Sequence, residues 1–332
     1  MKRIAINGLG RIGRLTLRNL LQDKRVEVVA VNDLASSQTI AHLFKYDTAH
    51  GKYPEPVSNT ENSLVIGDLE IAYSRIKNPE ELPWGDLKVD IVLECTGVFR
   101  TEESASKHFV AGAKRVVISA PAKGGTVPFI VLGVNDEILT RDTTIISNAS
   151  CTTNCLAPVV QLLEEELGIS HGFITTTHGY TVDQRLQDAP HTDLRRARAA
   201  AQNIIPTSTG AAAAVGIVLP AIKGKLHASA LRVPVITGSL IELTCIVNKK
   251  ASIEEINALF KNASLHRYSG ILEYNEDEIV SSDIIGNKHS SIFDAPLTNV
   301  HDTLIKVTSW YDNESGYAAR MHDLAVRMAE LM

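Results

Sequence analysis

The sequence predicts an α/β protein whose N-terminal half forms a doubly wound parallel sheet. A glycine-rich turn separates a short apolar strand from an amphipathic helix within the first 21 residues, and a second strand ends at an acidic residue, Asp33. Further short apolar strands then alternate with helical segments up to about residue 150. Buried apolar strands separated by helices are typical of parallel sheets that are covered on both faces.

The composition is that of an ordinary globular protein of two or three domains. The 332 residues are 44% apolar and 21% charged, with a net charge of −5. The densest basic run, residues 193–201, is short and typical of a solvated or interface segment, so no nucleic-acid partner is expected. No apolar stretch reaches the ~20 residues of a membrane span, and the N-terminus lacks a signal-peptide pattern. Four cysteines in a chain of this length indicate a reduced, cytoplasmic protein with no membrane partner.

The first strand and helix, "RIAINGLGRIGRLTLRNLLQD", enclose a G-x-G-x-x-G motif at Gly8, Gly10 and Gly13. The first glycine permits a tight turn, the second lets the backbone approach a pyrophosphate, and the third allows close packing of helix on strand. The helix N-terminus then faces the anion. Incidental turns also contain such triplets, but the position between a strand and a helix favours a dinucleotide site.

Asp33 ends the next strand, "VEVVAVND", 20 residues beyond Gly13. At this spacing an acidic residue is expected to bind the ribose hydroxyls of the cofactor. A carboxylate accepts a hydrogen bond from a free 2′-hydroxyl and repels a 2′-phosphate, so the sequence favours NAD over NADP.

The later strands of the predicted sheet end in small or polar residues. We expect buried strands at "VDIVLECTG" (89–97), "RVVISAPA" (115–122), "PFIVLGVN" (128–135) and "TTIISNAS" (143–150), with a helix at "EESASKHFVAGA" (102–113). Ligands bind at the carboxyl ends of parallel strands, which makes Thr96, Gly97 and Ser119 candidate cofactor neighbours. The alternative is that all three are ordinary strand-end turn residues.

Two cysteines lie four residues apart in "SNASCTTNCLAP" (147–158), where a helix is expected from about Ser150. In a helix their Cβ atoms are ~5–6 Å apart, which is too far for a disulfide, and no further Cys or His stands nearby to complete a metal site. We therefore predict no metal and one nucleophile, Cys151, whose pKa is lowered at the first helical turn. Cys155 is predicted to pack inside, and Pro158 to kink or split the helix.

A nucleophilic thiol needs a base, and His178 follows the threonine-rich, β-prone run "GFITTTHGYT". A lone histidine is more often structural, but the hydroxyl and guanidinium groups around it are typical of phosphate recognition. Thr209 and Gly210 precede a helix in "PTSTGAAAA", which predicts a second anion site. Arg232 stands in an otherwise apolar strand, where a charge implies a partner.

Six segments together resemble the phosphorylating glyceraldehyde-3-phosphate dehydrogenase family: "INGLGRIGR", "ECTGVF", "SNASCTTNCLAP", "DLRRARAAAQNIIPTSTGAA", "RVP" and "WYDNESGY". They occur in the family's order and extend from residue 4 to 317. The resemblance implies a homotetramer whose chains carry a Rossmann NAD-binding domain at 1–150, completed by a C-terminal helix at 316–332. It also implies an α+β catalytic domain at 151–315 with a large mixed or antiparallel sheet.

The same resemblance implies the chemistry. Cys151 attacks the aldehyde of glyceraldehyde 3-phosphate, His178 acts as base, hydride passes to NAD, and inorganic phosphate cleaves the thioester to give 1,3-bisphosphoglycerate. By motif, the substrate phosphate is held by Thr181 and Arg232, and the attacking phosphate by Ser150, Thr152, Thr209 and Gly210.

For the cofactor, the resemblance implies that Arg11 and Ile12 offer backbone groups to the pyrophosphate. Asn313 is expected to orient the nicotinamide carboxamide and Tyr317 to pack against its ring. Ala189 stands where NAD-specific relatives often carry leucine, which predicts a weaker exclusion of NADP than Asp33 alone suggests.

Two other functions fit parts of the sequence. Erythrose-4-phosphate dehydrogenase shares the nucleophile and base, although its relatives usually differ from "THGYT" and "NIIPTSTGAA". A non-catalytic NAD-binding or scaffold protein would retain the fold, but the presence of both Cys151 and His178 disfavours it.

Overall fold

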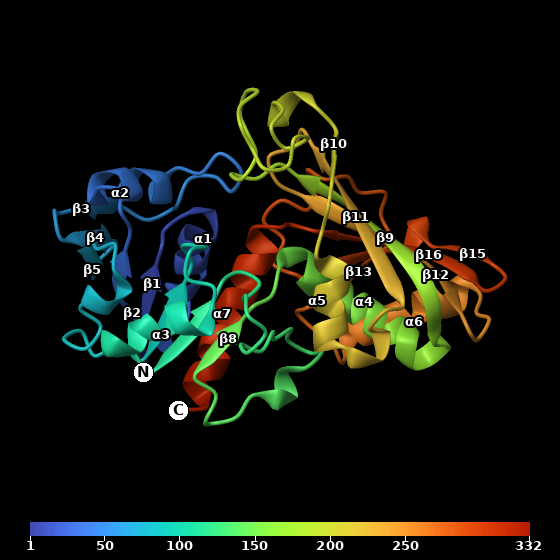
Figure 1. The fold of residues 1–332 in the computed structure, drawn as a ribbon, viewed down its shortest axis with the longest axis horizontal. Helices are drawn as coiled ribbons and strands as arrows, with labels where there is room; N and C mark the ends of the chain where they lie inside the picture. Colours follow the sequence, from blue (N-terminus) through green and yellow to red (C-terminus); the bar gives the residue numbers. More distant parts are fainter. The chain divides into compact units, whose positions relative to one another are not determined.

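The computed structural model describes residues 1–332, which divide into two compact units. The first unit holds Met1–Ile130, Glu137–Ala149 and Ala318–Met332, and the second holds Val131–Asp136 and Ser150–Tyr317. Each unit contains one eight-stranded sheet (Figure 1).

The sheet of the first unit has the strand order β3-β4-β5-β2-β1-β6-β7-β8. All pairs from β5 to β8 are parallel, whereas β3, β4 and β5 form an antiparallel edge. The strands are β1 Lys2–Asn7, β2 Val26–Asn32, β3 Val57–Asn59, β4 Ser63–Ile66, β5 Leu69–Ser74, β6 Ile91–Glu94, β7 Arg115–Ile118 and β8 Ile145–Ser147. The predicted parallel, doubly wound sheet is confirmed.

Helices connect these strands and bury their apolar faces against the sheet. They are α1 Arg11–Leu20, α2 Ser37–Lys45, α3 Glu102–Val110 and the greater part of α7 Ser315–Glu330, together with the short 3₁₀ helix η1 Pro79–Glu81. Thr101 begins α3 with a capping box, because its hydroxyl accepts from the Ser104 N–H while Ser104 caps Thr101 in return. The core lies where β1 and β6 pass between the helices, with Ile4, Ile6 and Val92 fully buried.

The sheet of the second unit is mixed, as the resemblance implied. Its order is β10-β11-β9-β12-β16-β14-β13, with β15 paired to β16, and the β9–β11 and β13–β14 pairs are parallel. The strands are β9 Ile169–Gly179, β10 Ile205–Thr207, β11 Leu226–Val233, β12 Ser239–Val247, β13 Leu272–Asn275, β14 Ser291–Asp294, β15 Asn299–His301 and β16 Leu304–Tyr311.

One face of this second sheet is covered by α4 Cys151–Leu167, α5 Ala211–Val218 and α6 Ile253–Leu265 (Figure 1). The remaining 3₁₀ helices are η2 Asp136–Ile138, η3 Ala200–Gln202, η4 Pro220–Ile222 and η5 Ala295–Leu297. Helix α4 packs against β9, β12, β14 and β16. Along β9 the buried residues Ile174, Thr176 and His178 alternate with more exposed ones, so His178 points to the same side of the sheet as α4.

One predicted strand is absent, and of the kink or split predicted at Pro158 the split does not occur. The segment 128–135 is not a strand, because its only ladder contact is an isolated bridge between Phe129 and Ser147. Helix α4 is not split at Pro158, since it runs without interruption from Cys151 to Leu167. An internal proline costs ~3 kcal/mol, but burial of each large apolar side chain returns ~1.5–3 kcal/mol, and several on this helix are fully buried.

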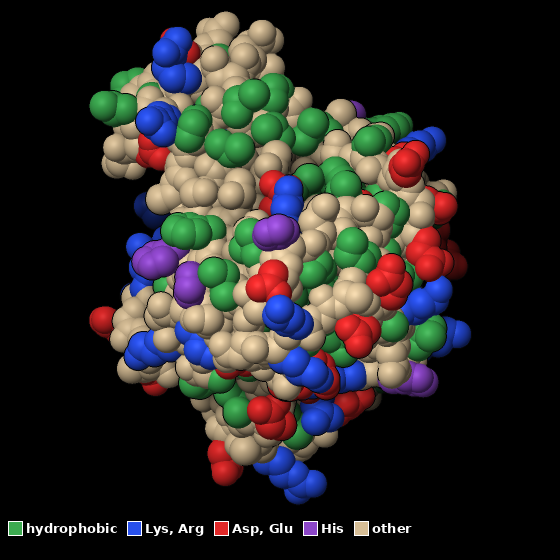
Figure 2. All heavy atoms as spheres, turned by 90° about the vertical axis from the view of Figure 1, so that its right-hand side faces the viewer, with side chains coloured by type: hydrophobic (Ala, Val, Ile, Leu, Met, Phe, Trp, Pro, Cys, Tyr) green, Lys and Arg blue, Asp and Glu red, His purple; other side chains and the backbone are tan.

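The long loop between β9 and β10 exposes large apolar side chains. Val182 and Leu186 are each 84% exposed and Leu194 is 81% exposed. Figure 2 shows hydrophobic side chains gathered at the top of the view, where this loop lies. Among the helices of the chain, none combines the length and apolarity that crossing a membrane requires.

Candidate active site and cofactor pocket

The glycine turn between β1 and α1 brings the strand and the helix into direct contact. A Cβ added to Gly13 would lie 2.0 Å from the carbonyl oxygen of Gly8, and a Cβ on Gly8 would lie 2.7 Å from the Thr96 nitrogen. Gly8 also has φ +95°, which disfavours other residues. By contrast, a Cβ on Gly10 would meet no atom within 4 Å. Two of the glycines therefore serve packing, and Gly10 faces open space from which a ligand can approach.

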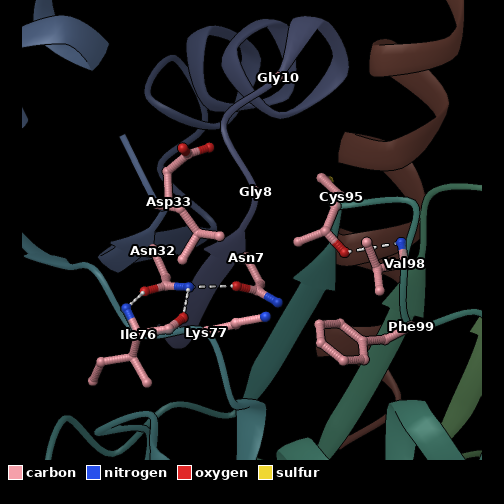
Figure 3. Close-up of a pocket in the computed structure, with 12 residues that line it drawn as sticks. Asn7, Gly8, Gly10, Asn32, Asp33, Ile76, Lys77, Cys95, Val98 and Phe99 are labelled. Carbon is pink, nitrogen blue, oxygen red and sulfur yellow. Dashed lines mark hydrogen bonds between the residues drawn. The ribbon is translucent and has the colours of Figure 1, made fainter. Parts of the chain in front are cut away.

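A pocket of about 390 Å³ opens at the carboxyl ends of β1, β2 and β6 (Figure 3). Four of the predicted residues line it, namely Gly8, Gly10, Asp33 and Thr96, and sequence reasoning missed the others: Asn7, Asn32, Leu34, Ile76, Lys77, Cys95, Val98 and Phe99. The Asp33 carboxylate accepts from the N–H groups of Leu9 at 2.8 Å and Ala35 at 3.0 Å. These bonds fix the carboxylate at the rim of the pocket.

A buried polar network ties together the strand ends below the pocket. Glu94, which is 1% exposed, accepts from Asn7 Nδ2 at 2.6 Å and from the Thr96 N–H at 2.8 Å. Asn7 Oδ1 in turn accepts from Asn32 Nδ2 at 2.8 Å (Figure 3). Sequence could have indicated both asparagines, because "AIN" and "AVN" end two neighbouring parallel strands with the same polar residue.

The other predicted cofactor residues do not line this pocket. The side chain of Arg11 is engaged by Asp47 at 2.5 and 3.0 Å. Arg11 and Ile12 form the first turn of α1, and the pocket lining includes neither of them. The lining of the pocket does not include Gly97 or Ser119. Asn313 and Tyr317 belong to the second unit.

In the second unit, the predicted thiol and imidazole meet. Cys151 is the first residue of α4, and its Sγ lies 3.5 Å from His178 Nε2. Ser150 caps the helix by accepting from the Thr153 N–H at 3.1 Å. His178 is 4% exposed, and its Nδ1 lies 2.6 Å from the carbonyl oxygen of Gly179. A proton on Nδ1 bonded to this carbonyl leaves the Nε2 lone pair directed at the thiol.

Both groups favour their neutral forms. Burial raises the pKa of the Cys151 thiol and outweighs the opposing effects of the Arg232 cation and of the N–H groups of Cys151 and Thr152. The expectation of a lowered thiol pKa at the helix N-terminus is therefore wrong for this state of the site, because desolvation of the thiolate exceeds its stabilisation. Burial and the nearby Arg232 cation together lower the pKa of His178 to about 3.

The other cysteine of the motif is packed inside, as predicted. Cys155 is 0% exposed, and its Sγ lies 3.5 Å from the Ser291 hydroxyl. Burial raises the pKa of Cys155, Cys95 and Cys245 to about 12 in each case. All four cysteines are free, and no group of three or more His, Cys, Asp or Glu side chains is arranged to hold a metal ion.

Arg232 lies beside the histidine because β11 pairs with β9 in a register that places the two residues opposite each other. Its Nη1 is 2.7 Å from His178 Nδ1, 3.0 Å from the Gly179 oxygen and 3.4 Å from Thr181 Oγ1. The Nε of Arg232 is buried and has no hydrogen-bond partner. The predicted pair Thr181 and Arg232 is thus brought together, and the buried Nε of Arg232 is left without a partner.

A second cation stands in the loop between β9 and β10. Arg196 donates to Asp183 at 2.7 Å, to the Thr207 hydroxyl at 2.9 Å and to the Ser208 carbonyl at 3.2 Å. Asp183 also accepts from the Thr181 hydroxyl. Arg196 therefore lies next to the segment of Thr209 and Gly210 that precedes α5. Sequence reasoning noted the arginine-rich run but could not decide which of its arginines faces the site.

The hydroxyls predicted to hold the attacking phosphate have internal partners. Thr152 Oγ1 is 2.8 Å from the Tyr311 hydroxyl, and Ser150 Oγ is 2.7 Å from Thr153 Oγ1. Thr209 Oγ1 accepts from the Ala211 N–H at 3.2 Å, at the start of α5. A hydroxyl that accepts one bond still has a proton to donate, so these contacts leave Thr209 able to bind an anion.

Comparisons with known proteins agree over nearly the whole chain. A family model described as the glyceraldehyde 3-phosphate dehydrogenase NAD binding domain matches residues 2–102, and one described as its C-terminal domain matches residues 150–313. The chain is 54% identical to the glyceraldehyde-3-phosphate dehydrogenase of Mycobacterium avium over 329 residues, which is 97% of both chains. It is 54% identical to that of Thermotoga maritima over 326 residues, covering 97% of this chain and 98% of the relative. The chain belongs to the glyceraldehyde-3-phosphate dehydrogenase family.

The family assignment makes the protein an NAD-dependent oxidoreductase with NAD as its cofactor. A further relative, the glyceraldehyde-3-phosphate dehydrogenase of Geobacillus stearothermophilus, is 51% identical over 329 residues, covering 98% of both chains. The pocket of the first unit fits NAD: open space above Gly10 admits a pyrophosphate, and the anchored Asp33 carboxylate offers acceptors to ribose hydroxyls.

Hydrogen bonds fix the orientation of the Asn313 side-chain amide. Its Oδ1 accepts from the Gly238 N–H at 3.1 Å and from the Ser239 hydroxyl at 2.9 Å. Because an N–H can only donate, the oxygen of the amide must face Gly238. The NH₂ of Asn313 is therefore the end of the side chain that is left to donate to a ligand.

Proposed function

We propose that the enzyme oxidises glyceraldehyde 3-phosphate to 1,3-bisphosphoglycerate with NAD⁺ and inorganic phosphate, through covalent intermediates on Cys151. The observation that carries the proposal is the 3.5 Å contact between Cys151 Sγ and His178 Nε2 at the N-terminus of α4. A family member without this pair would lack a nucleophile activated by a base.

The steps follow from the chemistry of a thiol and an aldehyde. Cys151 sulfur bonds to the carbonyl carbon as its proton passes to His178 Nε2, and His178 returns this proton to the former aldehyde oxygen, which becomes the hydroxyl of a hemithioacetal. His178 then removes the proton of that hydroxyl while the hydride on the same carbon leaves, which produces a thioester. Bound NAD⁺ supplies the hydride acceptor. Phosphate oxygen finally attacks the thioester carbon, and the Cys151 thiolate departs.

Two anion sites serve the two phosphates. Thr181 and Arg232 hold the substrate phosphate, supported by the buried and unused Nε of Arg232. Thr209, Gly210 and the N-terminus of α4 hold the attacking phosphate, with Ser150 and Thr152 placed at that end of the helix. We add Arg196 to this second site, because its guanidinium contacts the adjacent Thr207 and Ser208.

The nucleotide pocket of the first unit holds the cofactor. Gly8, Gly10, Gly13, Asp33 and Thr96 shape the nucleotide pocket, with backbone groups of Arg11 and Ile12 on the pyrophosphate and with Gly97 and Ser119 at neighbouring strand ends. The NH₂ of Asn313 recognises the carbonyl of the nicotinamide carboxamide, and Tyr317 packs against the ring. The domains are residues 1–150 with helix 316–332, and residues 151–315.

The enzyme acts as a homotetramer in the cytoplasm. The exposed apolar side chains of the β9–β10 loop support assembly, because monomers rarely leave such side chains clustered on their surface. Four free cysteines support a reducing compartment.

The proposed reaction is tested by NADH formation from glyceraldehyde 3-phosphate with and without inorganic phosphate. We expect multiple turnovers with phosphate and no more than one equivalent of NADH per chain without it, since the thioester then accumulates. Sustained turnover without phosphate would indicate simple aldehyde oxidation by water. A parallel assay with erythrose 4-phosphate compares kcat/KM for the alternative substrate, which should be the lower of the two.

A further inference from the structure

The guanidinium of Arg196 is held on all three of its nitrogens. Its Nε donates to Thr207 Oγ1 at 2.9 Å, its Nη1 to Asp183 Oδ2 at 2.7 Å and its Nη2 to the Ser208 carbonyl oxygen at 3.2 Å. A guanidinium has five N–H donors, so these bonds leave one donor on Nη1 and one on Nη2. A phosphate group binds best to a pair of such donors, which requires that the guanidinium has a fixed orientation.

Thr207 fixes the Nε side of this guanidinium. The hydroxyl oxygen of Thr207 accepts from Arg196 Nε, and its single proton is donated to Asp193 Oδ2 at 2.6 Å. The directions of both bonds are determined, because the N–H of an arginine can only donate and an ionised carboxylate can only accept. Asp193 therefore orients the Thr207 hydroxyl, and the hydroxyl in turn orients Arg196.

Asp193 is itself fixed by the turn that carries Arg196. Its Oδ1 accepts from the N–H groups of Arg195 at 2.9 Å and of Arg196 at 3.4 Å. Its Oδ2 also lies 3.6 Å from Arg196 Nε. One carboxylate thus holds both the backbone of this turn and, through Thr207, the side chain of Arg196.

Thr207 connects the same turn to the sheet of the second unit. Arg196 lies in the irregular loop between β9 and β10, whereas Thr207 is the last residue of β10 and pairs with Ala230 of β11. Two residues earlier in β10, Ile205 pairs with Arg232. The bond between Thr207 and Arg196 therefore fixes the arginine of the loop relative to the strand that carries Arg232.

The guanidinium held in this way lies near both the reacting residues and the start of α5. Burial and the Arg232 cation lower the pKa of His178, and the Arg196 cation adds to this effect. The Ser208 carbonyl, which accepts from Arg196, directly precedes Thr209. The two spare donors of Arg196 therefore belong to the site proposed for the attacking phosphate.

We propose that Thr207 is a positioning residue for the attack of phosphate on the thioester. Its hydroxyl, oriented by Asp193, sets the Arg196 guanidinium in place for the inorganic phosphate. The inference rests on the proposed function, which assigns Arg196 to this phosphate. Thr207 acts through Arg196, because its only proton is donated to Asp193. Loss of the hydroxyl therefore weakens the use of phosphate, while formation of the thioester and the charge of the site stay the same.

The test compares two kinetic ratios in the full-length enzyme saturated with NAD. The ratio kcat/KM for inorganic phosphate reports the attack on the thioester, whereas kcat/KM for glyceraldehyde 3-phosphate reports the steps that form it. In Thr207→Val, which keeps the shape of the side chain and the net charge, we expect the ratio for phosphate to fall about fivefold to tenfold. The ratio for glyceraldehyde 3-phosphate, and the NADH formed in the absence of phosphate, should stay within about twofold of the wild type.

Two variants assign the effect to the hydroxyl of Thr207. Thr207→Ser retains this hydroxyl and should keep the ratio for phosphate within about twofold of the wild type. Asp188→Asn is the matched control for loosening of the loop. Asp188 accepts from Arg198 Nε at 2.8 Å and from the Ala199 N–H at 3.0 Å in the same loop. Neither bond involves Arg196, so the ratio for phosphate should not change.

A double-mutant cycle shows whether Thr207 acts through Arg196. In Arg196→Leu we expect the ratio for phosphate to fall about tenfold or more, because the phosphate loses a charged partner. Addition of Thr207→Val to Arg196→Leu should change that ratio by less than about twofold, since the residue that Thr207 orients is already absent.

An unchanged ratio for phosphate in Thr207→Val or in Arg196→Leu overturns the proposal. So does a fall in Thr207→Val that is matched in Thr207→Ser or Asp188→Asn, that persists in the Arg196→Leu background, or that affects both ratios equally. The wild type separates these results from failure of the proposed function. Phosphate-dependent NADH formation by the wild type keeps the proposed reaction in each case, whereas its absence removes the proposed function itself.

Discussion

The thiol and imidazole of the site are both shifted toward their neutral forms by the same cause. Burial penalises the Cys151 thiolate and the His178 imidazolium alike. A proton moved from sulfur to nitrogen creates two opposite charges 3.5 Å apart, whose attraction offsets part of this cost.

Replacement of the nucleophile should separate binding from chemistry. In Cys151→Ser the hydroxyl is a far weaker nucleophile than a thiolate, so we expect NADH formation to fall at least ~10³-fold. The NAD dissociation constant, measured by fluorescence titration, should change less than twofold, because the nucleotide pocket is lined by residues of the first unit. Cys155→Ser is the matched control and should retain turnover. Substantial activity of Cys151→Ser would remove this residue as the nucleophile.

For single residues, the sequence could identify the nucleophile and the base but not the side chains that form hydrogen bonds around the anion sites. Cys151 and His178 were predictable because each stands at the end of an element whose neighbours are distinctive. Arg196 was not, because Arg195, Arg196 and Arg198 lie in one irregular loop with no periodicity to orient them. Asp183, which holds both Thr181 and Arg196, gives no local signal at all.

Among the elements, the contact between β1 and α1 leaves no room for a side chain at Gly13 but leaves open space at Gly10. Gly13→Ala puts a Cβ 2.0 Å from a backbone oxygen, which forces the helix away from the strand. We expect it to destabilise the fold by ~2–4 kcal/mol. Gly10→Ala meets no atom within 4 Å and should cost less than ~1 kcal/mol, yet weaken NAD binding about tenfold or more by blocking the pyrophosphate.

Urea unfolding and NAD titration on both glycine variants measure these effects. The two readouts should separate, with stability lost at Gly13 and affinity lost at Gly10. Equal stability of the two variants would contradict the packing role of Gly13, and unchanged affinity in Gly10→Ala would contradict the pyrophosphate approach.

The last helix of the chain depends on one buried arginine. Arg115, which is 5% exposed, donates to the carbonyl oxygens of Met328 at 2.7 Å, Leu331 at 3.1 Å and Arg141 at 2.6 Å. In Arg115→Met these carbonyls lose their donor, and we expect a loss of ~2–3 kcal/mol. Hydrogen exchange should speed up mainly in the last turn of α7. Arg327→Met removes only an exposed ion pair and should change stability by less than ~0.5 kcal/mol.

The apolar pattern of the sequence predicted the paired strands better than it predicted the segments that connect them. The run "PFIVLGVN" has the apolar and β-branched content of a strand, but Gly133 has φ +80° and the Val131 N–H bonds to the Asn135 side chain instead of a neighbouring strand. Apolar content alone reports burial, and burial does not require a ladder. In α4, the local helix-breaking preference of Pro158 predicted a split, but burial of the apolar side chains of the helix outweighs that preference.

For the whole molecule, the buried histidine makes stability depend on pH. The unfolded chain binds a proton at His178 below about pH 6.5, whereas the folded chain stays neutral there until about pH 3. Stability from this residue is therefore present above pH 6.5 and is lost as the pH falls. Between pH 7.5 and 5.0 it should lose ~2 kcal/mol.

Urea unfolding at the two pH values measures this loss. His178→Asn has no such group, so its free energy of unfolding should fall by ~2 kcal/mol less than that of the wild type over the same interval. Equal falls would show that His178 titrates alike in the folded and unfolded chains, which contradicts the effect of burial and of Arg232.

The two units are built from interleaved parts of the chain, and this has a consequence for the order in which they are made. Residues 318–332 belong to the first unit, although 168 residues of the second precede them, from Ser150 to Tyr317. On the ribosome, Arg115 emerges long before the carbonyls of Met328 and Leu331 exist. All eight strands of the first sheet are therefore synthesised before the second unit, and the helix that completes the first unit is synthesised only after it. Until α7 is synthesised, the nascent chain exposes the apolar surface of the first unit that this helix covers. Such surface is a target for chaperones, and docking of α7 removes it from solvent.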